Sequence, residues 1–278
     1  MTILVTGARG HVGGAVLTEL LAAGQAVRAS SRDPRPGDFP DGVEVVRADL
    51  TEPDSLPDAL AGVRKVFLYA HPEAAVEFAA EARKAGVQHV VLLSSASVLF
   101  PDAQTHPVAM SHLTVERALE QAGLDWTFLR PGIFATNSLQ WQSIRTEREL
   151  RTAFPDATLS PVHERDIAAI AARALLDDTH RRAAYPVLGA GPLTLRKQVA
   201  AIAEALGEPV RLTEVDVDTY RRDLLTQLPG YLVERVIHDR GQLPQLPAEL
   251  GTDAVPDVLG RPALTFAEWA RDHAADFR

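Results

Sequence analysis

Three glycines at intervals of three residues stand near the amino terminus, and this pattern constrains the fold more than any other stretch of the chain. The apolar run Ile3–Val5 before them predicts a buried strand. Gly7, Gly10 and Gly13 follow it, and apolar residues then recur at helical spacing as far as Leu21. A strand, a glycine turn and a helix in this order are typical of segments that hold the pyrophosphate of a dinucleotide. The alternative is a tight strand–helix turn that binds no ligand.

Each glycine has a separate task in such a loop. Gly7 allows a sharp turn, Gly10 lets backbone amides approach phosphate oxygens, and Gly13 lets the helix pack close to the sheet. The free N–H groups and the dipole of the helix amino terminus favour the anion. The residues predicted to contact the cofactor in this loop are Gly7, Arg9, Gly10, His11, Val12 and Gly13.

The segment after the second predicted strand, Gln25–Ala29, bears on the choice of cofactor. NAD-dependent enzymes usually place a carboxylate there for the ribose 2′-hydroxyl. This chain has Ser30, Ser31 and Arg32, and a serine with an arginine would bind a 2′-phosphate instead. We therefore expect Ser31 and Arg32 to contact NADP(H), in preference to NAD(H), and Arg9 could reach the same phosphate. The alternatives for Arg32 are a solvated loop side chain or a pair with Asp33.

The rest of the amino-terminal half alternates apolar runs with helical patterns, which predicts a parallel sheet covered on both faces. The additional strands are expected at Val43–Val46, Val66–Tyr69, Val90–Leu93 and Trp126–Leu129. Ligands of such sheets lie off the carboxyl ends of the strands. The residues predicted to contact the cofactor at that rim are Asp49, Leu50, Tyr69, Ala70, His71, Ser94 and Pro131. Asp49 has an alternative role as a cap of the helix predicted from Pro53 to Ala61.

Composition excludes several classes of protein. The chain has 278 residues, 46% of them hydrophobic, which suits one large domain or a domain with a smaller lobe. A formal charge of −9 without a dense Lys/Arg block argues against direct nucleic-acid binding. The absence of cysteine excludes disulfides and thiolate metal sites, and the nine histidines show no metal-ligand spacing, so we expect no metal. We expect no signal peptide, no membrane span and a cytoplasmic location.

Several segments resemble the NmrA-like branch of the atypical short-chain dehydrogenase/reductases. They are Gly7–Gly13, Leu93–Ser97, Ser111–Glu116, Trp126–Pro131, His163–Ala168 and Leu259–Ala270. The resemblance implies an α/β, Rossmann-type doubly wound parallel sheet that binds NAD(P), with a small, mostly helical carboxyl-terminal substrate lobe. It implies that Arg32 favours NADPH and that Ser95 matches the catalytic serine of ordinary short-chain reductases. It also places Val108 and His112 at the positions of the Tyr-x-x-x-Lys pair.

The missing tyrosine leaves more than one function open. The leading hypothesis is an NADPH-dependent oxidoreductase that reduces a carbonyl, enone or quinone-like small molecule. Ser95 would orient the acceptor, and His112 would position the ribose or a water that supplies the proton. The alternatives are a non-catalytic NADP(H) sensor and a redox-neutral isomerase or cyclase. Ser95 could instead be an ordinary loop or cap serine, and His112 a satisfied core histidine.

The expected domains are a core at residues 1–135, with a strand and helix returning at about 160–190, and a lobe at 136–160 and 190–278. A helix is predicted over Ser138–Arg151. Asp166 is expected to cap its helix or to tie it to the loop after the sixth strand. Aromatic residues of the lobe suggest an apolar or aromatic substrate, and the residues predicted to contact it are Phe134, Trp141 and Tyr231. We expect a monomer or a homodimer.

Overall fold

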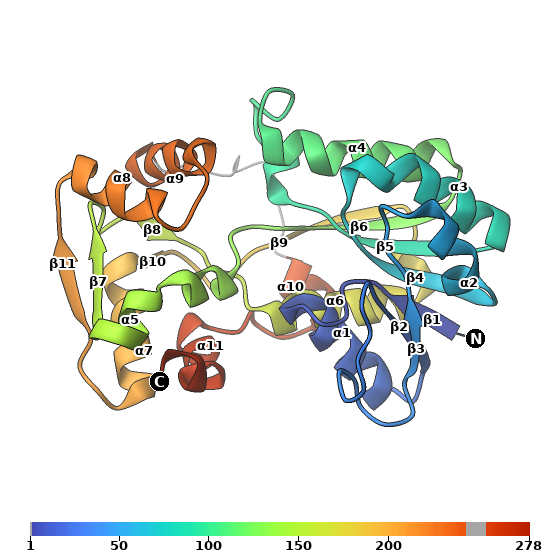
Figure 1. The fold of residues 1–278 in the computed structure, drawn as a ribbon, viewed down its shortest axis with the longest axis horizontal. Coiled ribbons are helices and arrows are strands. Elements are labelled where there is room, and N and C mark those ends of the chain that lie inside the picture. The colour runs from blue at the N-terminus through green and yellow to red at the C-terminus, as the bar shows by residue number, and fades with distance from the viewer. Residues whose placement is uncertain (1, 243–253) are drawn as a thin grey trace. The chain divides into compact units, whose positions relative to one another are not determined.

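The computed structural model describes residues 2–242 and 254–278, which form two compact units (Figure 1). Among the described residues, the first unit combines 2–132, 164–187 and 254–261, and the second combines 133–163, 188–242 and 262–278. The sequence assigned all of 190–278 to the second lobe. Helix α10 (Ala254–Leu259) instead packs on α6 (Glu164–Leu176) and β9 (Ala183–Val187) of the first unit.

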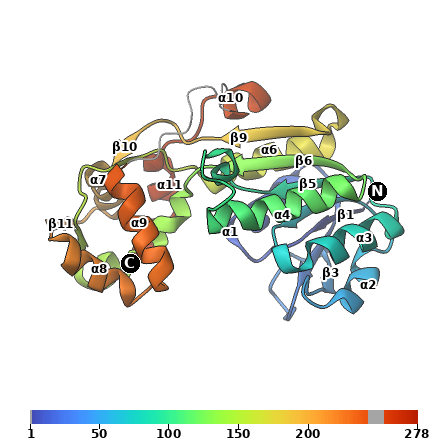
Figure 2. The ribbon, with the colours of Figure 1, turned by 90° about the horizontal axis from the view of Figure 1, so that it is seen from above.

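Within its described residues, the first unit holds a sheet of seven parallel strands in the order β3-β2-β1-β4-β5-β6-β9. Besides β9, the strands are β1 (Thr2–Val5), β2 (Ala26–Ser31), β3 (Glu44–Arg47), β4 (Val63–Tyr69), β5 (His89–Leu93) and β6 (Asp125–Pro131). Figure 2 shows β5, β6 and β9 side by side at one edge of the sheet. The predicted Rossmann-type α/β fold is therefore confirmed.

Helices cover both faces of this sheet because its central strands are apolar on both faces. Every residue of β5 is buried. Figure 1 shows α1 (His11–Ala22) and α6 on one face. The opposite face carries α2 (Leu56–Leu60), α3 (Ala75–Ala85) and α4 (Pro107–Gln121).

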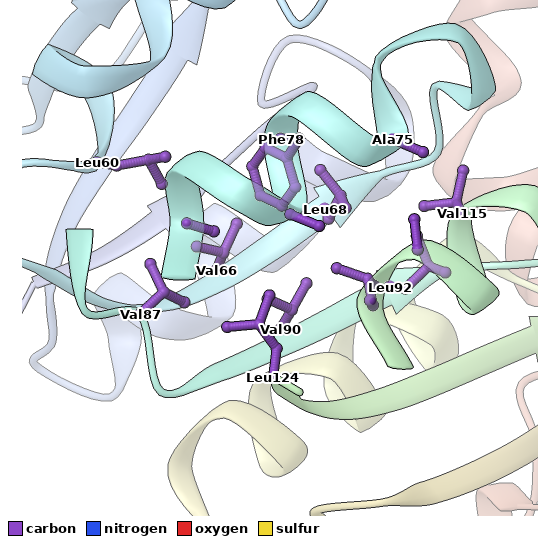
Figure 3. Close-up of a cluster of buried hydrophobic side chains, with 14 of the residues drawn as sticks. Leu60, Val66, Leu68, Ala75, Phe78, Val87, Val90, Leu92, Val115 and Leu124 are labelled. Carbon is purple, nitrogen blue, oxygen red and sulfur yellow. The ribbon is translucent and has the colours of Figure 1, made fainter. Parts of the chain in front are cut away.

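One hydrophobic cluster fills the layer between the sheet and the second group of helices. Figure 3 shows Phe78 of α3 and Val115 of α4 with side chains from β4 and β5, including Leu68 and Val90. Phe78 and Val115 are at most 2% exposed. Burial on this scale stabilises by about 1.5–3 kcal/mol per large apolar side chain. The cluster fixes α3 and α4 on the sheet, and with them the residues at the amino end of α4.

The helix predicted over Ser138–Arg151 is wrong in its second half. The chain forms a 3-10 helix η4 (Ala135–Gln140), the short helix α5 (Gln142–Glu147) and then strand β7 (Glu149–Thr152). Arg148 has φ 54°, a left-handed conformation that ends α5. Leu150 and Thr152 are then buried in alternation with Arg151, which is the period of a strand.

The second unit joins short strands to helices around its own core. Strand β7 pairs in parallel with β11 (Arg211–Glu214), and β8 (Thr158–Leu159) pairs antiparallel with β10 (Leu193–Thr194). Trp269 of α11 (Phe266–Asp272) is fully buried in a cluster to which α7 (Leu195–Leu206) contributes. Helices α8 (Val217–Leu225) and α9 (Gly230–Gln242) also belong to this unit. No helix in the described parts of the chain is both long and apolar enough to cross a membrane.

Asp166 pairs with an arginine from the segment after α10. Its fully buried carboxylate forms an ion pair with Arg261, with 2.7 Å between Oδ1 and Nη2. This pair was not expected from the sequence, and the expected roles as a helix cap or a tie to the loop after the sixth strand stay predictions. Asp166 joins α6 to the segment after α10, because a buried carboxylate needs a compensating charge and Arg261 supplies it.

The amino ends of the central strands carry a cluster of charged and polar side chains. Lys65 is buried and donates to the Leu175 carbonyl at 2.8 Å and to Asp178 at 2.7 Å. Arg181 forms ion pairs with Asp178 and Asp125. We call Lys65, His89, Asp125, Thr127, Asp178, His180, Arg181 and Arg182 the amino-end cluster. Its side chains bind mainly one another and the backbone of the first unit.

Candidate cofactor and active site

The carboxyl ends of the parallel strands form a rim in the first unit, and the strand order reverses there between β1 and β4. In open α/β sheets, ligands bind in the crevice outside such a reversal. The glycine loop follows β1, and Tyr69 is the last residue of β4, so both lie at this crevice. The register pairs Val5 with both Ala29 and Phe67, which places the ends of β2 and β4 beside the loop.

Thr6 joins the two strands that flank the reversal. Its backbone N–H and its hydroxyl both donate to the Phe67 carbonyl, at 3.0 and 3.1 Å. The same hydroxyl accepts from the Tyr69 N–H at 2.7 Å. The side chain of Thr6 therefore continues the β1–β4 pairing past the end of β1. This fixes the start of the glycine loop relative to Tyr69.

The glycine loop is packed so closely that a Cβ at any of three positions would crowd other atoms of the protein. Gly7 has φ +62°, and a Cβ there would lie 3.3 Å from the Cβ of Tyr69. A Cβ on Gly10 would lie 3.2 Å from the Gly7 carbonyl oxygen, and one on Gly13 only 2.3 Å from the same atom. The last contact excludes every residue except glycine at position 13. This cradle fits a pyrophosphate, which needs backbone amides that no side chain screens.

Helix α1 starts at the end of this loop without a competing anion. Gly10 is its N-cap, no side chain caps it, and its first turn contains no acidic residue. The predicted contact residues His11 and Val12 are its first two residues. Val12 is buried, so its side chain contributes packing and only its backbone could face a ligand. The N–H groups and the positive end of the dipole are therefore placed to receive a phosphate.

Three arginines lie in the glycine loop and in the segment after β2. Arg9 Nη1 donates to the Asp33 carbonyl and to Asp38 Oδ2, both at 3.1 Å. Arg35 donates to Asp33 through Nε and Nη2, at 3.1 and 2.9 Å. Arg32 is exposed and, within the described residues, makes no hydrogen bond or ion pair. The alternative in which Asp33 neutralises Arg32 is therefore wrong, since Asp33 binds Arg35.

Two predicted contact residues after β3 have structural partners. Asp49 Oδ1 accepts from the N–H and the hydroxyl of Thr51, at 2.9 and 2.8 Å. These hydrogen bonds hold the pKa of the Asp49 carboxyl below its usual range, with a smaller contribution from the charge of Arg32. Leu50 packs against the hydrophobic cluster of Figure 3. Asp49 therefore stabilises the turn before η1 (Pro53–Ser55), and its Oδ2 is the atom left for a ligand.

The end of β4 is open. Tyr69 is 57% exposed, although it is a large aromatic residue. Ala70 follows it, and His71 is the N-cap of the 3-10 helix η2 (Pro72–Ala74) without a side-chain cap bond. The Nδ1 atom of His71 is buried and has no hydrogen-bond partner in the part of the chain that the structure describes. A buried polar atom without a partner is costly, so a ligand group here would be stabilised.

The two serines after β5 are both engaged. Ser94 is buried, and its hydroxyl donates to Glu116 Oε1 at 2.6 Å. The Ser95 hydroxyl lies 2.9 Å from that of Ser97 and accepts from the Ser97 N–H at 3.2 Å. Ser95 is thus the N-cap of the 3-10 helix η3 (Ala96–Leu99). Ser95 therefore acts as a cap, which was its alternative role, and its predicted contact with a substrate stays a prediction.

Glu116 and Arg130 form an ion pair that the sequence interpretation did not identify. Arg130 donates through Nε and Nη2 to the two carboxylate oxygens of Glu116, at 3.0 and 2.6 Å. Together with Ser94 this bidentate pair ties α4 to the ends of β5 and β6. Glu116 lies on the stripe of α4 that carries the buried Val115 and Leu119. A charged residue at a buried helical position needs a partner, so the position of Glu116 in the sequence could have indicated a buried ion pair.

His112 stands one turn before Glu116 on α4. Its Nδ1 is buried and has no partner among the described residues. Burial lowers the pKa of His112, against the opposing effect of the Glu116 charge. The alternative in which His112 is a core histidine with its hydrogen bonds satisfied is therefore wrong for Nδ1. Val108, one turn earlier on α4, is 38% exposed.

The other predicted residues divide between the two units. Pro131 ends β6 and is buried in the first unit. Phe134 and Trp141 are half-buried, Tyr231 is 66% exposed, and these three belong to the second unit. Across the residues that are described, no group of three or more His, Cys, Asp or Glu side chains could hold a metal ion.

Comparisons with known proteins agree with this geometry. A family model described as NAD(P)H-binding matches residues 7–178. The chain is 35% identical over 279 residues to (4-alkanoyl-5-oxo-2,5-dihydrofuran-3-yl)methyl phosphate reductase of Streptomyces griseus, over 99% of both chains. It is 34% identical over 286 residues to the NAD(P)H azoreductase of Xenophilus azovorans, again over 99% of both chains.

Solved structures of low sequence identity share the fold. Triphenylmethane reductase of Citrobacter sp. superposes with a TM-score of 0.80 at 23% identity, over 99% of each chain. The NADPH-dependent quinone oxidoreductase of Escherichia coli superposes with a TM-score of 0.75 at 24% identity, over 98% of this chain and 99% of the other. Structures of these two proteins contain NADP(H) and NADPH, respectively.

Proposed function

Because the chain belongs to the NAD(P)H-binding family and is an NAD(P)H-dependent oxidoreductase of the NmrA-like type, we propose that it reduces an enone or quinone-like small molecule with NADPH. The observation that carries this proposal is the pair of residues at the amino end of α4. Val108 is apolar, and His112 offers the rim a buried Nδ1 that has no partner within the described structure.

Residues of the first unit would hold the cofactor. The cradle of Gly7, Gly10 and Gly13 fits the diphosphate, since a Cβ on any of them would approach Gly7 or Tyr69 atoms at 3.3 Å or less. Arg32 supplies an uncommitted positive charge at the end of β2, which supports a preference for NADPH over NADH. When bound, the reduced nicotinamide supplies a hydride equivalent.

The absence of a tyrosine at position 108 bears on which hydride acceptors the protein can reduce. A simple ketone that gains a hydride becomes an alkoxide, a strong base that needs a general acid beside it. The family resemblance places Val108 where ordinary short-chain reductases carry that acid, and a valine side chain holds no ionisable proton. An enone or quinone that gains a hydride becomes a delocalised anion whose oxygen is less basic than that of an alkoxide, so water can protonate it. The chain is therefore suited to conjugated acceptors.

His112 suits a role in positioning. Because burial lowers its pKa, the imidazole is neutral at pH 7 and can either donate or accept one hydrogen bond through Nδ1. We assign it to a ribose hydroxyl or to a water that protonates the reduced substrate. Ser95 would orient the acceptor only if its hydroxyl turned away from Ser97. Phe134, Trp141 and Tyr231 are proposed to contact the substrate.

The two curated relatives support a conjugated substrate. Their names describe reductases of an oxo- and alkanoyl-substituted dihydrofuran and of azo compounds. Both names describe a double bond that can accept a hydride: a C=C bond conjugated to two carbonyl groups in the dihydrofuran, and the N=N bond of azo compounds. The shared chemistry, rather than either named substrate, is carried over to this chain.

A stopped-flow experiment tests the proposal. The protein is loaded with NADPH and mixed with a naphthoquinone, a cyclic enone, an azo dye and a saturated cyclic ketone, and NADPH absorbance is followed. We expect oxidation with the conjugated acceptors and none with the saturated ketone. A Gly13→Ala variant, which cannot form the cradle, serves as the control for contaminating reductases. Equal rates with the saturated ketone, or no oxidation with any acceptor, would contradict the proposal.

A further inference from the structure

An ion pair ties the segment after β2 to the glycine loop. Arg9 Nη1 lies 3.1 Å from Asp38 Oδ2 and also donates to the Asp33 carbonyl. Asp38 Oδ2 accepts in addition from the Arg35 N–H at 2.9 Å. Asp38 is therefore fixed by its own turn, and Arg9 is drawn toward that turn. Arg32, three residues before Arg35, remains uncommitted in the described structure.

We propose that Asp38 determines cofactor specificity by holding Arg9 and by opposing the charge of the 2′-phosphate, so that this chain binds NADPH less tightly than its arginines would allow. The inference rests on the proposed 2′-phosphate position at the end of β2. It adds to that proposal a residue that acts against the phosphate.

The exposure of the pair makes it exchangeable. The Arg9 side chain is 49% exposed and that of Asp38 is 21% exposed, so water screens their attraction. A phosphate dianion is a stronger acceptor for guanidinium than one carboxylate. A 2′-phosphate can therefore draw Arg9 from Asp38, but the cofactor then loses the energy of the broken pair and meets an unpaired carboxylate.

The carboxylate stays charged throughout the working range of pH. The backbone N–H of Arg35 lowers the pKa of Asp38, and the charge and hydrogen bond of Arg9 lower it further. Removing the charge therefore requires a substitution. Asp38→Asn keeps an oxygen that can accept from the Arg35 N–H while it removes the charge, so the turn is preserved.

Asp41→Asn is the matched control. Asp41 is exposed, belongs to the same loop, and within the described residues makes no hydrogen bond or ion pair. The substitution changes the net charge by the same amount as Asp38→Asn. It therefore measures the effect of overall charge on an anionic ligand without releasing Arg9.

The experiment is isothermal titration of the wild type and both variants with NADPH, NADH, adenosine 2′,5′-bisphosphate and ADP, at low and high NaCl. For Asp38→Asn we expect roughly fivefold tighter binding of NADPH and the bisphosphate, an effect that salt reduces. NADH and ADP should change by less than about twofold, since they carry no 2′-phosphate for Arg9 to bind. Asp41→Asn should change the affinity for each of the four ligands by less than about twofold.

Three results would overturn the inference. They are equal gains for NADPH and NADH, no gain in Asp38→Asn, and the same gain in Asp41→Asn. Arg32→Ser tests the underlying proposal separately. If Arg32→Ser binds NADPH as tightly as the wild type, the proposed position of the 2′-phosphate beside Arg32 is wrong. The role of Asp38 is decided separately, by the titration of Asp38→Asn with the bisphosphate.

Discussion

The two ends of the sheet in the first unit use polar residues in opposite ways. At the amino ends, Lys65, Asp178, Arg181 and Asp125 bind one another, and within the described residues the exceptions are His89 Nδ1 and Arg181 Nε. At the carboxyl ends, Arg32 and the Nδ1 atoms of His71 and His112 lack protein partners, as far as the chain is described. Saturated polar groups stabilise the fold, and groups without partners remain for a ligand. The comparison predicts that variants at one end change stability and variants at the other change affinity.

The largest expected effect is at the glycine cradle. Gly13→Ala places a Cβ 2.3 Å from the Gly7 carbonyl oxygen, so the loop must move. We expect NADPH and NADH affinity to fall by roughly 100-fold or more, because the displaced amides no longer face the diphosphate. Gly14→Ala is the control, since its Cβ would lie 3.3 Å from the Ala8 carbonyl oxygen, where a small adjustment suffices. Calorimetric titration of both variants measures the effect, and wild-type affinity in Gly13→Ala would contradict it.

The second effect is a loss of stability in acid, and it comes from the amino-end cluster. His89 is fully buried, and burial lowers its pKa from 6.5 to about 4, with Lys65 as the next cause. Thr127 donates its hydroxyl proton to the His180 carbonyl, so His89 Nε2 must donate to Thr127 at 2.8 Å. Nδ1 is thus unprotonated and has no partner within the described structure.

The sign of this pH dependence follows from the lowered pKa. Between pH 6.5 and about 4 the unfolded chain binds a proton at residue 89 that the folded chain does not. The free energy of unfolding therefore falls as the pH falls through this range, by up to about 3 kcal/mol. Urea unfolding at several pH values measures it, and His89→Gln should flatten the slope. The paired carboxylates Asp125 and Asp178 have lowered pKa values, so they contribute below this range.

The third effect sharpens the comparison at the carboxyl ends. Arg32→Ser should weaken NADPH binding by roughly 10- to 100-fold, because one charge-assisted phosphate contact contributes about 1.5–3 kcal/mol. NADH binding and the melting temperature should not change, since Arg32 makes no hydrogen bond or ion pair within the described residues. Arg35→Ser is the control, because Arg35 is held by Asp33. Equal losses for both cofactors would show that Arg32 does not contact the 2′-phosphate.

The smallest effect is at the opposite end. Lys65→Met removes the donor to Leu175 and Asp178, which should lower the free energy of unfolding by about 1 kcal/mol. The loss stays small because Asp178 is solvated and keeps its pair with Arg181. Cofactor affinity should match the wild type. If Lys65→Met folded as stably as the wild type but bound NADPH weakly, the assignment of the amino-end cluster to stability would be wrong.

The strands and the glycine loop could be predicted from sequence because their causes are local. Ile3–Val5 and Val90–Leu93 are apolar runs of strand length, and the glycine spacing is set by contacts within one turn. The expected helix over Ser138–Arg151 was wrong because the burial of Leu150 and Thr152 depends on pairing with β11. Apolar spacing alone could not reveal that partner, which lies much later in the chain.

Side-chain partners were the least predictable part of the site. Glu116 binds Ser94 and Arg130, which come from two different strands, and only the folded sheet brings them together. Arg9 and Arg32 are both near the end of β2, but the turn at Asp38 decides which of them is paired. The residue types at the rim could be predicted, whereas the atoms left available to a ligand required the structure.

The ion pair between Asp166 and Arg261 has a consequence for how this protein can be divided. The polypeptide returns to the nucleotide-binding half after passing through most of the other half, and Arg261 arrives with that last return. Any truncation upstream of Arg261 removes the cation that pairs with the buried Asp166 carboxylate. The amino-terminal portion is consequently not a transferable cassette, and fusions or deletions should keep the tail through Arg261 intact.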